Sequence, residues 1–179
     1  MRVAARTFAI RILAVASASV FVASSAVADV PTAAPTVGAP APGFEGATLE
    51  ARPFTVDWTA GDVTVVMFFA TYCGPCHRAL RELEAIRRMV GPRLRFVLVD
   101  AGENPAAVRS FFTDNPLPGH GTVVIDASGN DRRRWGCCEL EPTLFLVDHS
   151  GHVRYINHGW GEGSQAKYIR RIRNVTSPG

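Results

Sequence analysis

The feature that most constrains this chain is an unbroken apolar run that leads directly into a pair of cysteines. The run "VTVVMFF" at 63–69 is too continuous for a strand with one face in water, so it predicts a strand buried on both faces. After three further residues comes "CGPCH" at 73–77, and an amphipathic helical pattern continues to residue 90, with Met89 on its apolar face. A strand buried on both faces needs a covering layer on each side of its sheet, which favours an α/β fold.

The remaining hydrophobic pattern predicts an alternation of strands and helices. Asn104-Pro105 is a good helix start, with Asn as cap and Pro at the first helical position, and Gly91-Pro92 ends the helix that follows the cysteines. We expect further strands at 94–99, 122–125, 143–147 and 153–157, and helices at 76–90, 105–114 and 164–174. This order predicts a central mixed β-sheet with helices on both faces.

The N-terminus has the pattern of a targeting segment. Arginines in the first eleven positions precede an apolar run at 12–22, and the small residues at 26–28 supply a cleavage pattern. We therefore predict a signal peptide at 1–28, with an uncleaved membrane anchor as the alternative, because the stretch is nearly long enough to span a bilayer. The Pro- and Ala-rich segment 29–43 is predicted to be a linker, followed by a single domain at 44–179.

The formal charge of +3 is carried by the targeting segment. Arg2, Arg6 and Arg11 lie within it, whereas all acidic residues lie at or beyond Asp29, so the remainder holds 16 charges of each sign. Near neutrality argues against a nucleic-acid partner, which would select a basic face. The arginines at 132–134 are expected to be solvated in a loop. Export would place the chain in the periplasm or a comparable oxidising compartment, where paired cysteines form disulfides.

The position of the cysteines predicts a redox-active dithiol. Cys73 lies where the buried strand ends and the helix begins, so unpaired N–H groups and the helix dipole stabilise its thiolate. Cys76 follows about one turn later, close enough to attack a mixed disulfide formed at Cys73. A purely structural disulfide with so short a loop would contribute little stability. We therefore predict Cys73 and Cys76 as the catalytic pair, with no cofactor beyond their disulfide.

The same motif also matches covalent haem attachment, because His77 completes the pattern C-x-x-C-H. A haem would need a second axial ligand opposite His77 and an apolar pocket around the macrocycle. Met67 lies inside the buried strand and Met89 on the helix after the motif, so neither is well placed to be that ligand. The sequence therefore favours the dithiol over the haem.

The segments "VVMFFATYCGPCHRALRELEAI" and "PTLFLVDHSGHVRY" resemble the TlpA/ResA-type thiol–disulfide oxidoreductases, a branch of the thioredoxin-like superfamily. The resemblance spans about 44–175, and Phe69 and Tyr72 replace the two tryptophans usual in the family. It implies a thioredoxin-like fold, with Tyr72 at the substrate contact. It also implies reduction of disulfides in exported proteins, including apocytochromes c, an upstream membrane electron donor, and membrane contact only through a retained N-terminus.

By the same resemblance, Pro142 is the cis-proline beside the dithiol, at a strand start that tolerates proline. The backbone of Glu141 and Thr143 would then pair with an incoming substrate chain. Glu141 puts a carboxylate next to Pro142 and Glu139 adds another; a carboxylate of this pair that lies near Cys73 would raise the pKa of its thiol. A less stabilised thiolate favours the oxidised form of the protein, the property of a reductant.

A second pair, Cys137-Cys138 in "WGCCELEPT", has no counterpart in the family pattern. The two residues are interpreted in three ways: as small apolar side chains, as an adjacent disulfide or a pair that exchanges electrons with Cys73 and Cys76, or as ligands that join those cysteines and His77 around copper(I) or zinc. These alternatives stay open at the level of sequence.

Three function classes therefore compete. The first is the exported oxidoreductase, with no metal at its site. The second is a metal-binding protein or copper chaperone on the same fold, with the four cysteines as ligands. The third, a peroxidase of the peroxiredoxin kind, fits less well, because Val66 and Ala70 occupy the positions where its approach motif needs Pro and Thr.

Overall fold

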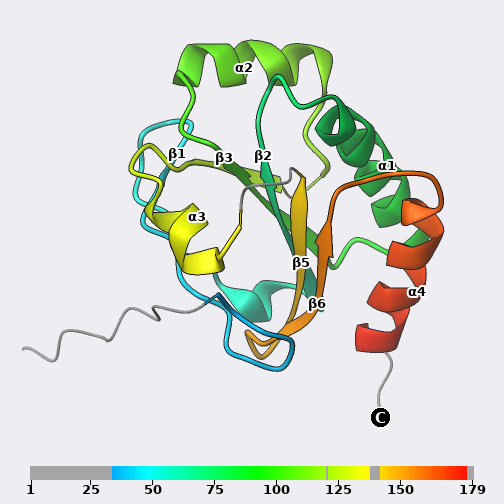
Figure 1. Cartoon of the computed structure of the whole chain (residues 1–179). Helices are drawn as coiled ribbons and strands as arrows, with labels where there is room; N and C mark the ends of the chain where they lie inside the picture. Colours follow the sequence, from blue (N-terminus) through cyan, green and yellow to red (C-terminus); the bar gives the residue numbers. More distant parts are fainter. Residues whose placement is uncertain (1–33, 120, 138–141, 177–179) are drawn as a thin grey trace, which may run out of the picture.

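The computed structural model describes residues 34–119, 121–137 and 142–176, and its centre is a six-stranded sheet (Figure 1). The strand order is β1-β4-β3-β2-β5-β6, in which β2, β3 and β4 are parallel to one another and β1, β5 and β6 each run antiparallel to their neighbours. The strands are β1 (Ala47–Thr48), β2 (Val63–Phe69), β3 (Leu94–Asp100), β4 (Gly121–Ile125), β5 (Thr143–Asp148) and β6 (Val153–His158). The mixed α/β sheet predicted from the sequence is confirmed.

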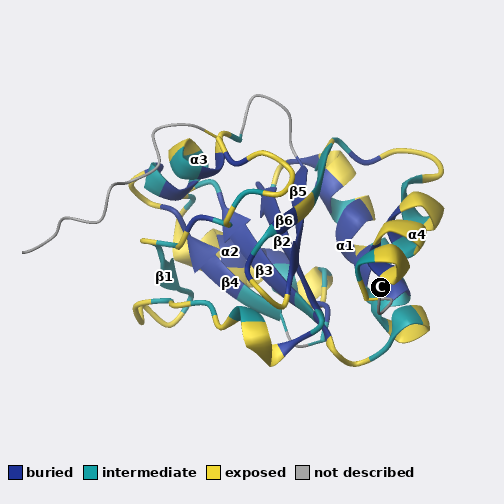
Figure 2. Cartoon of the chain, turned by 90° about the horizontal axis from the view of Figure 1, so that it is seen from below, coloured by how far each residue is buried: buried dark blue, intermediate teal, exposed yellow. Residues whose placement is uncertain are grey.

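Helices cover both faces of the sheet, again as predicted. The helices are α1 (Gly74–Val90), α2 (Pro105–Asp114), α3 (Asn130–Trp135) and α4 (Ser164–Thr176), and a single 3-10 turn, η1 (Trp58–Ala60), precedes β2. The buried side chains of α1, α2 and α4 share one core with the sheet. Trp135 of α3 and the segment 41–58 pack on the opposite face (Figures 1 and 2).

The strand β2 is buried along its whole length and contributes to both cores. Val65, Met67 and Phe69 point to the side covered by α1, whereas Val66 and Phe68 point to the side covered by α3. Each buried aliphatic or aromatic side chain of this size contributes about 1.5–3 kcal/mol. The end of β2, and with it the start of the cysteine motif, is therefore held firmly in the middle of the molecule.

Two local expectations were wrong. The arginines at 132–134 lie in the short helix α3 rather than in a solvated loop, because Asp126 accepts the N–H groups of Asp131 and Arg132 at 3.1 and 2.9 Å and so starts a helical turn. Arg132 also forms an ion pair with Asp126. Met89, expected on the buried face of the helix after the motif, is 51% exposed because it lies at the edge of the apolar stripe of α1.

The part of segment 29–43 that the structure describes lies against the hairpin between β5 and β6. The N–H of Gly38 donates to the carbonyl of Val153 at 2.7 Å, and the N–H of Ala41 donates to the carbonyl of Gly151 at 2.8 Å. These contacts attach the segment before residue 44 to the domain. In the described ranges, no helix combines the length and the apolar character needed to cross a membrane.

Candidate active site

The two cysteines of the motif form a disulfide at the start of α1. Cys73 caps the helix, and Cys76 lies in its first turn. The Sγ atom of Cys73 accepts the N–H of Cys76 at 3.2 Å, which is the contact expected of a helix-capping side chain. In the reduced protein this N–H and the helix dipole would face the Cys73 thiolate and stabilise it. The structure thus brings the predicted catalytic pair together.

The two sulfur-bearing residues differ in their access to solvent. Cys73 keeps 9% of its surface exposed, whereas Cys76 has none. An incoming disulfide can therefore reach Cys73 first, and Cys76 can act only from inside, on a partner already joined to Cys73. Tyr72, directly before the pair, is 78% exposed.

The sheet register brings β3 and β5 to the edge at which β2 ends. Asp100, the last residue of β3, pairs with Phe69, and Thr143, the first residue of β5, pairs with Phe68. Pro142 therefore lies at the same edge of the sheet as the dithiol loop. Its side chain is buried.

The surroundings of Thr143 are now defined. It is fully buried and lies in the ladder between Phe68 of β2 and His158 of β6. Its hydroxyl is 3.4 Å from Nδ1 of His158, and the carbonyl of Pro142 accepts the N–H of Gly159 at 2.7 Å. The predicted substrate contacts of Tyr72, Pro142 and Thr143 stay predictions, as does the cis form of Pro142.

Several predicted residues fall in the segment 138–141, outside the described residues. These are Cys138, Glu139 and Glu141, so their proposed effects on substrate or thiol stay predictions. Cys137 is half-buried against the core on the α3 side, and it carries no free thiol. The three interpretations of the second cysteine pair stay predictions.

An acidic residue that the sequence analysis missed contacts the dithiol loop. The carboxylate of Glu103 accepts the N–H and the hydroxyl of Thr71, each at 2.6 Å. The carbonyl of Thr71 in turn accepts a hydrogen bond from Nε2 of His77 at 2.8 Å. The position of Glu103 in the sequence could have indicated this contact. Glu103 closely follows β3, a strand that runs parallel beside β2 and ends at the same edge of the sheet.

A second acid, Asp100, is buried behind Glu103. Its Oδ1 accepts the N–H groups of Gly102 and Glu103 at 3.0 and 2.7 Å. Burial, and next the neighbouring carboxyl of Glu103, raise the pKa of Asp100 to about 7. Burial alone would also raise the pKa of Glu103, but the hydrogen bonds from Thr71 outweigh it and hold that pKa below its usual value.

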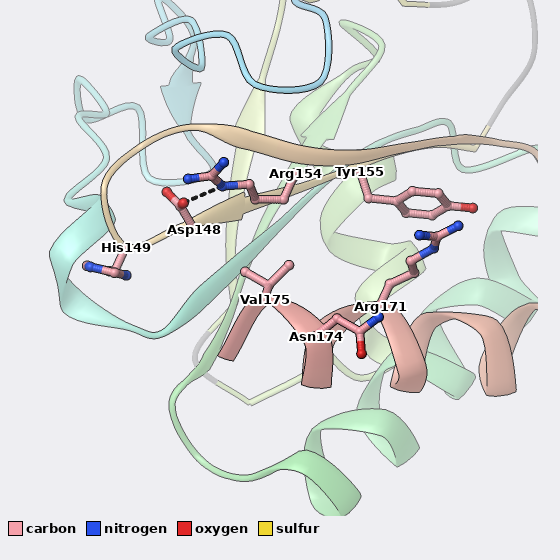
Figure 3. Close-up of a pocket in the computed structure, with 7 residues that line it drawn as sticks. All are labelled: Asp148, His149, Arg154, Tyr155, Arg171, Asn174 and Val175. Carbon is pink, nitrogen blue, oxygen red and sulfur yellow. Dashed lines mark hydrogen bonds and ion pairs between the residues drawn. The ribbon is translucent and has the colours of Figure 1, made fainter. Parts of the chain in front are cut away.

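The hollow shown in Figure 3 lies at the other end of the molecule. It is lined by Tyr155 and Arg171 among others, and by Asp148, which pairs with Val63 at the start of β2 rather than at its end. Within 34–119, 121–137 and 142–176, no three His, Cys, Asp or Glu side chains form a group that would hold a metal ion.

Comparison with known proteins agrees with this geometry. The sequence profile of the AhpC/TSA family matches residues 37–156. The thiol–disulfide oxidoreductase ResA of Geobacillus thermodenitrificans (strain NG80-2) is 31% identical over 126 residues, which are 69% of this chain and 70% of that protein.

Solved structures show the same fold at lower identity. The candidate thiol:disulfide interchange protein DsbE of Chlorobium tepidum superimposes with a TM-score of 0.67 at 23% identity, covering 80% of this chain and all of that one. A secreted disulfide oxidoreductase of Mycobacterium tuberculosis superimposes with a TM-score of 0.61 at 22% identity, covering 73% and 95% of the two chains. These structures establish the thioredoxin-like architecture of the sheet and helices.

Proposed function

Since this chain belongs to the AhpC/TSA family and is a thiol–disulfide oxidoreductase of the TlpA/ResA type, we propose that it reduces disulfides in exported proteins. The cysteines of apocytochromes c before haem attachment are the substrate that we propose within this class. The observation that carries the proposal is the arrangement of Cys73 and Cys76, one partly accessible at a helix start and one fully buried behind it.

The order of the reaction steps follows from the difference in solvent access between Cys73 and Cys76. The Cys73 thiolate attacks one sulfur of the substrate disulfide, and the other substrate sulfur leaves as a thiolate and takes up a proton. Cys76 then loses its proton and attacks the Sγ of Cys73, which releases the second substrate thiolate. The substrate has gained two electrons and two protons, and the enzyme holds the disulfide seen in the structure. A dithiol donor must then reduce this disulfide for the next cycle.

The proposed compartment lies outside the cytoplasm. The composition of residues 1–28 supports it, as does the structural likeness to a protein described as secreted. An oxidising compartment would also return the dithiol to the disulfide, so a reductant there needs a dedicated donor. We propose that this donor is a membrane protein that supplies electrons to the Cys73–Cys76 disulfide.

The activity is tested by following reduction of insulin by dithiothreitol with the parent chain, Cys73→Ala and Cys76→Ala. The parent is expected to accelerate the reaction, and both variants should fall to the uncatalysed rate. Tyr155→Phe, a substitution on β6 away from the dithiol edge, is the matched control and should behave as the parent. Undiminished activity of Cys73→Ala would overturn the mechanism.

The direction of electron flow is a separate measurement. Equilibration of the dithiol with glutathione or dithiothreitol gives the reduction potential of the pair. A potential near that of thioredoxin, about −270 mV, supports a reductant, and a potential near that of DsbA, about −120 mV, would make the protein an oxidant instead. Export is tested independently by fusing residues 1–33 to alkaline phosphatase, which is active only after it leaves the cytoplasm.

A further inference from the structure

Two acidic side chains lie beside the dithiol loop without a basic partner. Asp100 is fully buried and Glu103 is half-buried, and within the described ranges neither takes part in an ion pair. Burying an unpaired carboxylate is costly, and two such groups in contact repel each other as well. The arrangement therefore calls for a physical reason.

A proton shared by the two carboxyl groups would explain why Asp100 and Glu103 can be buried side by side. Oδ2 of Asp100 is buried and receives no N–H or hydroxyl donor from the residues that the structure describes. The Asp100 carboxyl nevertheless lies beside Glu103, because its Oδ1 accepts the N–H of that residue at 2.7 Å, and the neighbouring carboxyl of Glu103 favours the protonated form of Asp100. If Asp100 carries a proton, it donates to Glu103, and the orphaned oxygen and the repulsion are both accounted for. Burial favours the neutral form of Asp100, whereas the donors from Thr71 favour the charged form of Glu103.

The ionised Glu103 then restrains the loop that presents the nucleophile. Its two short bonds hold the N–H and the hydroxyl of Thr71, and His77 holds the carbonyl of the same residue from α1. The ring of His77 packs edge-on against Phe111 at 4.9 Å, which limits its movement. Thr71 is thus fixed on both sides, two residues before Cys73.

We propose that Asp100 and Glu103 hold one proton between them and that Glu103 is a positioning residue for the dithiol, fixing Cys73 through Thr71. This inference rests on the proposed thiol–disulfide exchange but not on the identity of the substrate. Glu103 would act on the Cys73 nucleophile through the protein backbone, without contact with the reacting atoms.

The proposal has a consequence for pH dependence. When the pair loses its proton above neutral pH, a second negative charge appears beside the loop and opposes the Cys73 thiolate. Among the residues that the structure describes, the other groups in this region are His77 from α1, the two cysteines, and Asp126 of the loop after β4. The N–H of Asp126 donates to the carbonyl of Asp100, while its carboxylate points to α3. The imidazole of His77, which donates to the carbonyl of Thr71, is controlled for by the substitution His77→Gln.

The test is the rate at which iodoacetamide alkylates Cys73 in the reduced chain between pH 5 and pH 9, located by peptide mass spectrometry. The pH dependence of the alkylation rate of the parent should show one ionisation in addition to that of the Cys73 thiol. Asp100→Asn should lose it, because the amide donates an N–H to Glu103 at every pH. Glu103→Gln should alkylate about three- to tenfold faster at pH 6, because a negative charge near the thiolate is gone. His77→Gln keeps a donor toward Thr71 and should retain the extra ionisation.

Defined outcomes would overturn the proposal. One is an alkylation profile of Asp100→Asn that superimposes on the parent, and another is loss of the extra ionisation in His77→Gln alone. Variants that change only the melting temperature would show a merely structural role. A measurement on the parent avoids any folding defect: carboxyl carbon NMR shifts should show one protonated group of the pair at pH 6, and two ionised groups there would refute it. Loss of insulin reduction with these profiles intact would instead refute the proposed function.

Discussion

The carboxylate of Glu84 connects the helix that carries the dithiol to the loop before β4, and its removal should weaken the fold in a pH-dependent way. The carboxylate accepts hydrogen bonds from Nε and Nη2 of Arg87 at 2.9 and 2.8 Å and from the N–H of Gly119 at 3.0 Å. These contacts, the bond from Arg87 above all, lower the pKa of Glu84 from 4.5 to about 2. The substitution Glu84→Gln removes the charge and keeps the shape.

The expected loss can be worked out from this shift. A fall from 4.5 to about 2 corresponds to about 3.5 kcal/mol, at about 1.4 kcal/mol per pKa unit. The side chains of Glu84 and Arg87 remain 27% and 22% exposed, so solvent screening reduces this value. An exposed pair with this spacing contributes only about 0.2–0.5 kcal/mol, but the two-pronged geometry and the N–H of Gly119 add to it. We expect a loss of about 1.5–2 kcal/mol at pH 7.

The sign of the pH dependence follows from the direction of the shift. Because the pKa of Glu84 is lower in the folded chain than in the unfolded chain, the contribution is complete above the unfolded value and is lost as pH falls through the folded one. Urea unfolding of the oxidised chain should therefore separate Glu84→Gln from the parent at pH 7 and by less than about half as much at pH 3. Glu50→Gln is the control, because Glu50 pairs with Arg52 on the exposed surface. Equal unfolding of Glu84→Gln and Glu50→Gln at pH 7 would refute the reasoning.

Other substitutions test separate parts of the structure. Trp160→Phe removes the N–H that donates to Glu82 at 2.8 Å, and urea unfolding should show a loss of about 1–3 kcal/mol; no loss would contradict the contact. Gly151→Ala should cost more than about 1 kcal/mol, because φ is +78° and the added Cβ would lie 2.8 Å from the ring of Trp58; an unchanged melting temperature would count against that backbone geometry. Tyr72→Ala should raise KM for a disulfide-containing peptide about fivefold without altering stability; an unchanged KM would remove Tyr72 from the substrate contact.

The sequence was sufficient to predict the centre of the fold because the strongest signals lie there. A seven-residue strand buried on both faces must be central, and the helix after the cysteines has a clear apolar stripe. The helix α3 was missed because six residues, "NDRRRW", are too few to show a helical period. It forms because Asp126, outside the helix, caps its first N–H groups.

The active site was predictable only in its local part. The pair Cys73 and Cys76 and the helix start lie within a few neighbouring residues, so their relation can be deduced from spacing. The contact between Glu103 and Thr71 joins residues 32 positions apart, and it depends on the register in which Asp100 pairs with Phe69. A pattern along the chain shows that acids follow β3, but only the paired strands show which loop they meet.

The proposed mechanism requires that Cys73 attacks first and that Cys76 resolves the intermediate. Cys76→Ser, incubated as the reduced protein with a peptide containing one disulfide, should accumulate a mixed disulfide that peptide mass spectrometry places on Cys73. The converse variant, Cys73→Ser, should accumulate none, because Cys76 is fully buried. A mixed disulfide found on Cys76 in the converse variant, with Cys76→Ser free of adduct, would contradict the account.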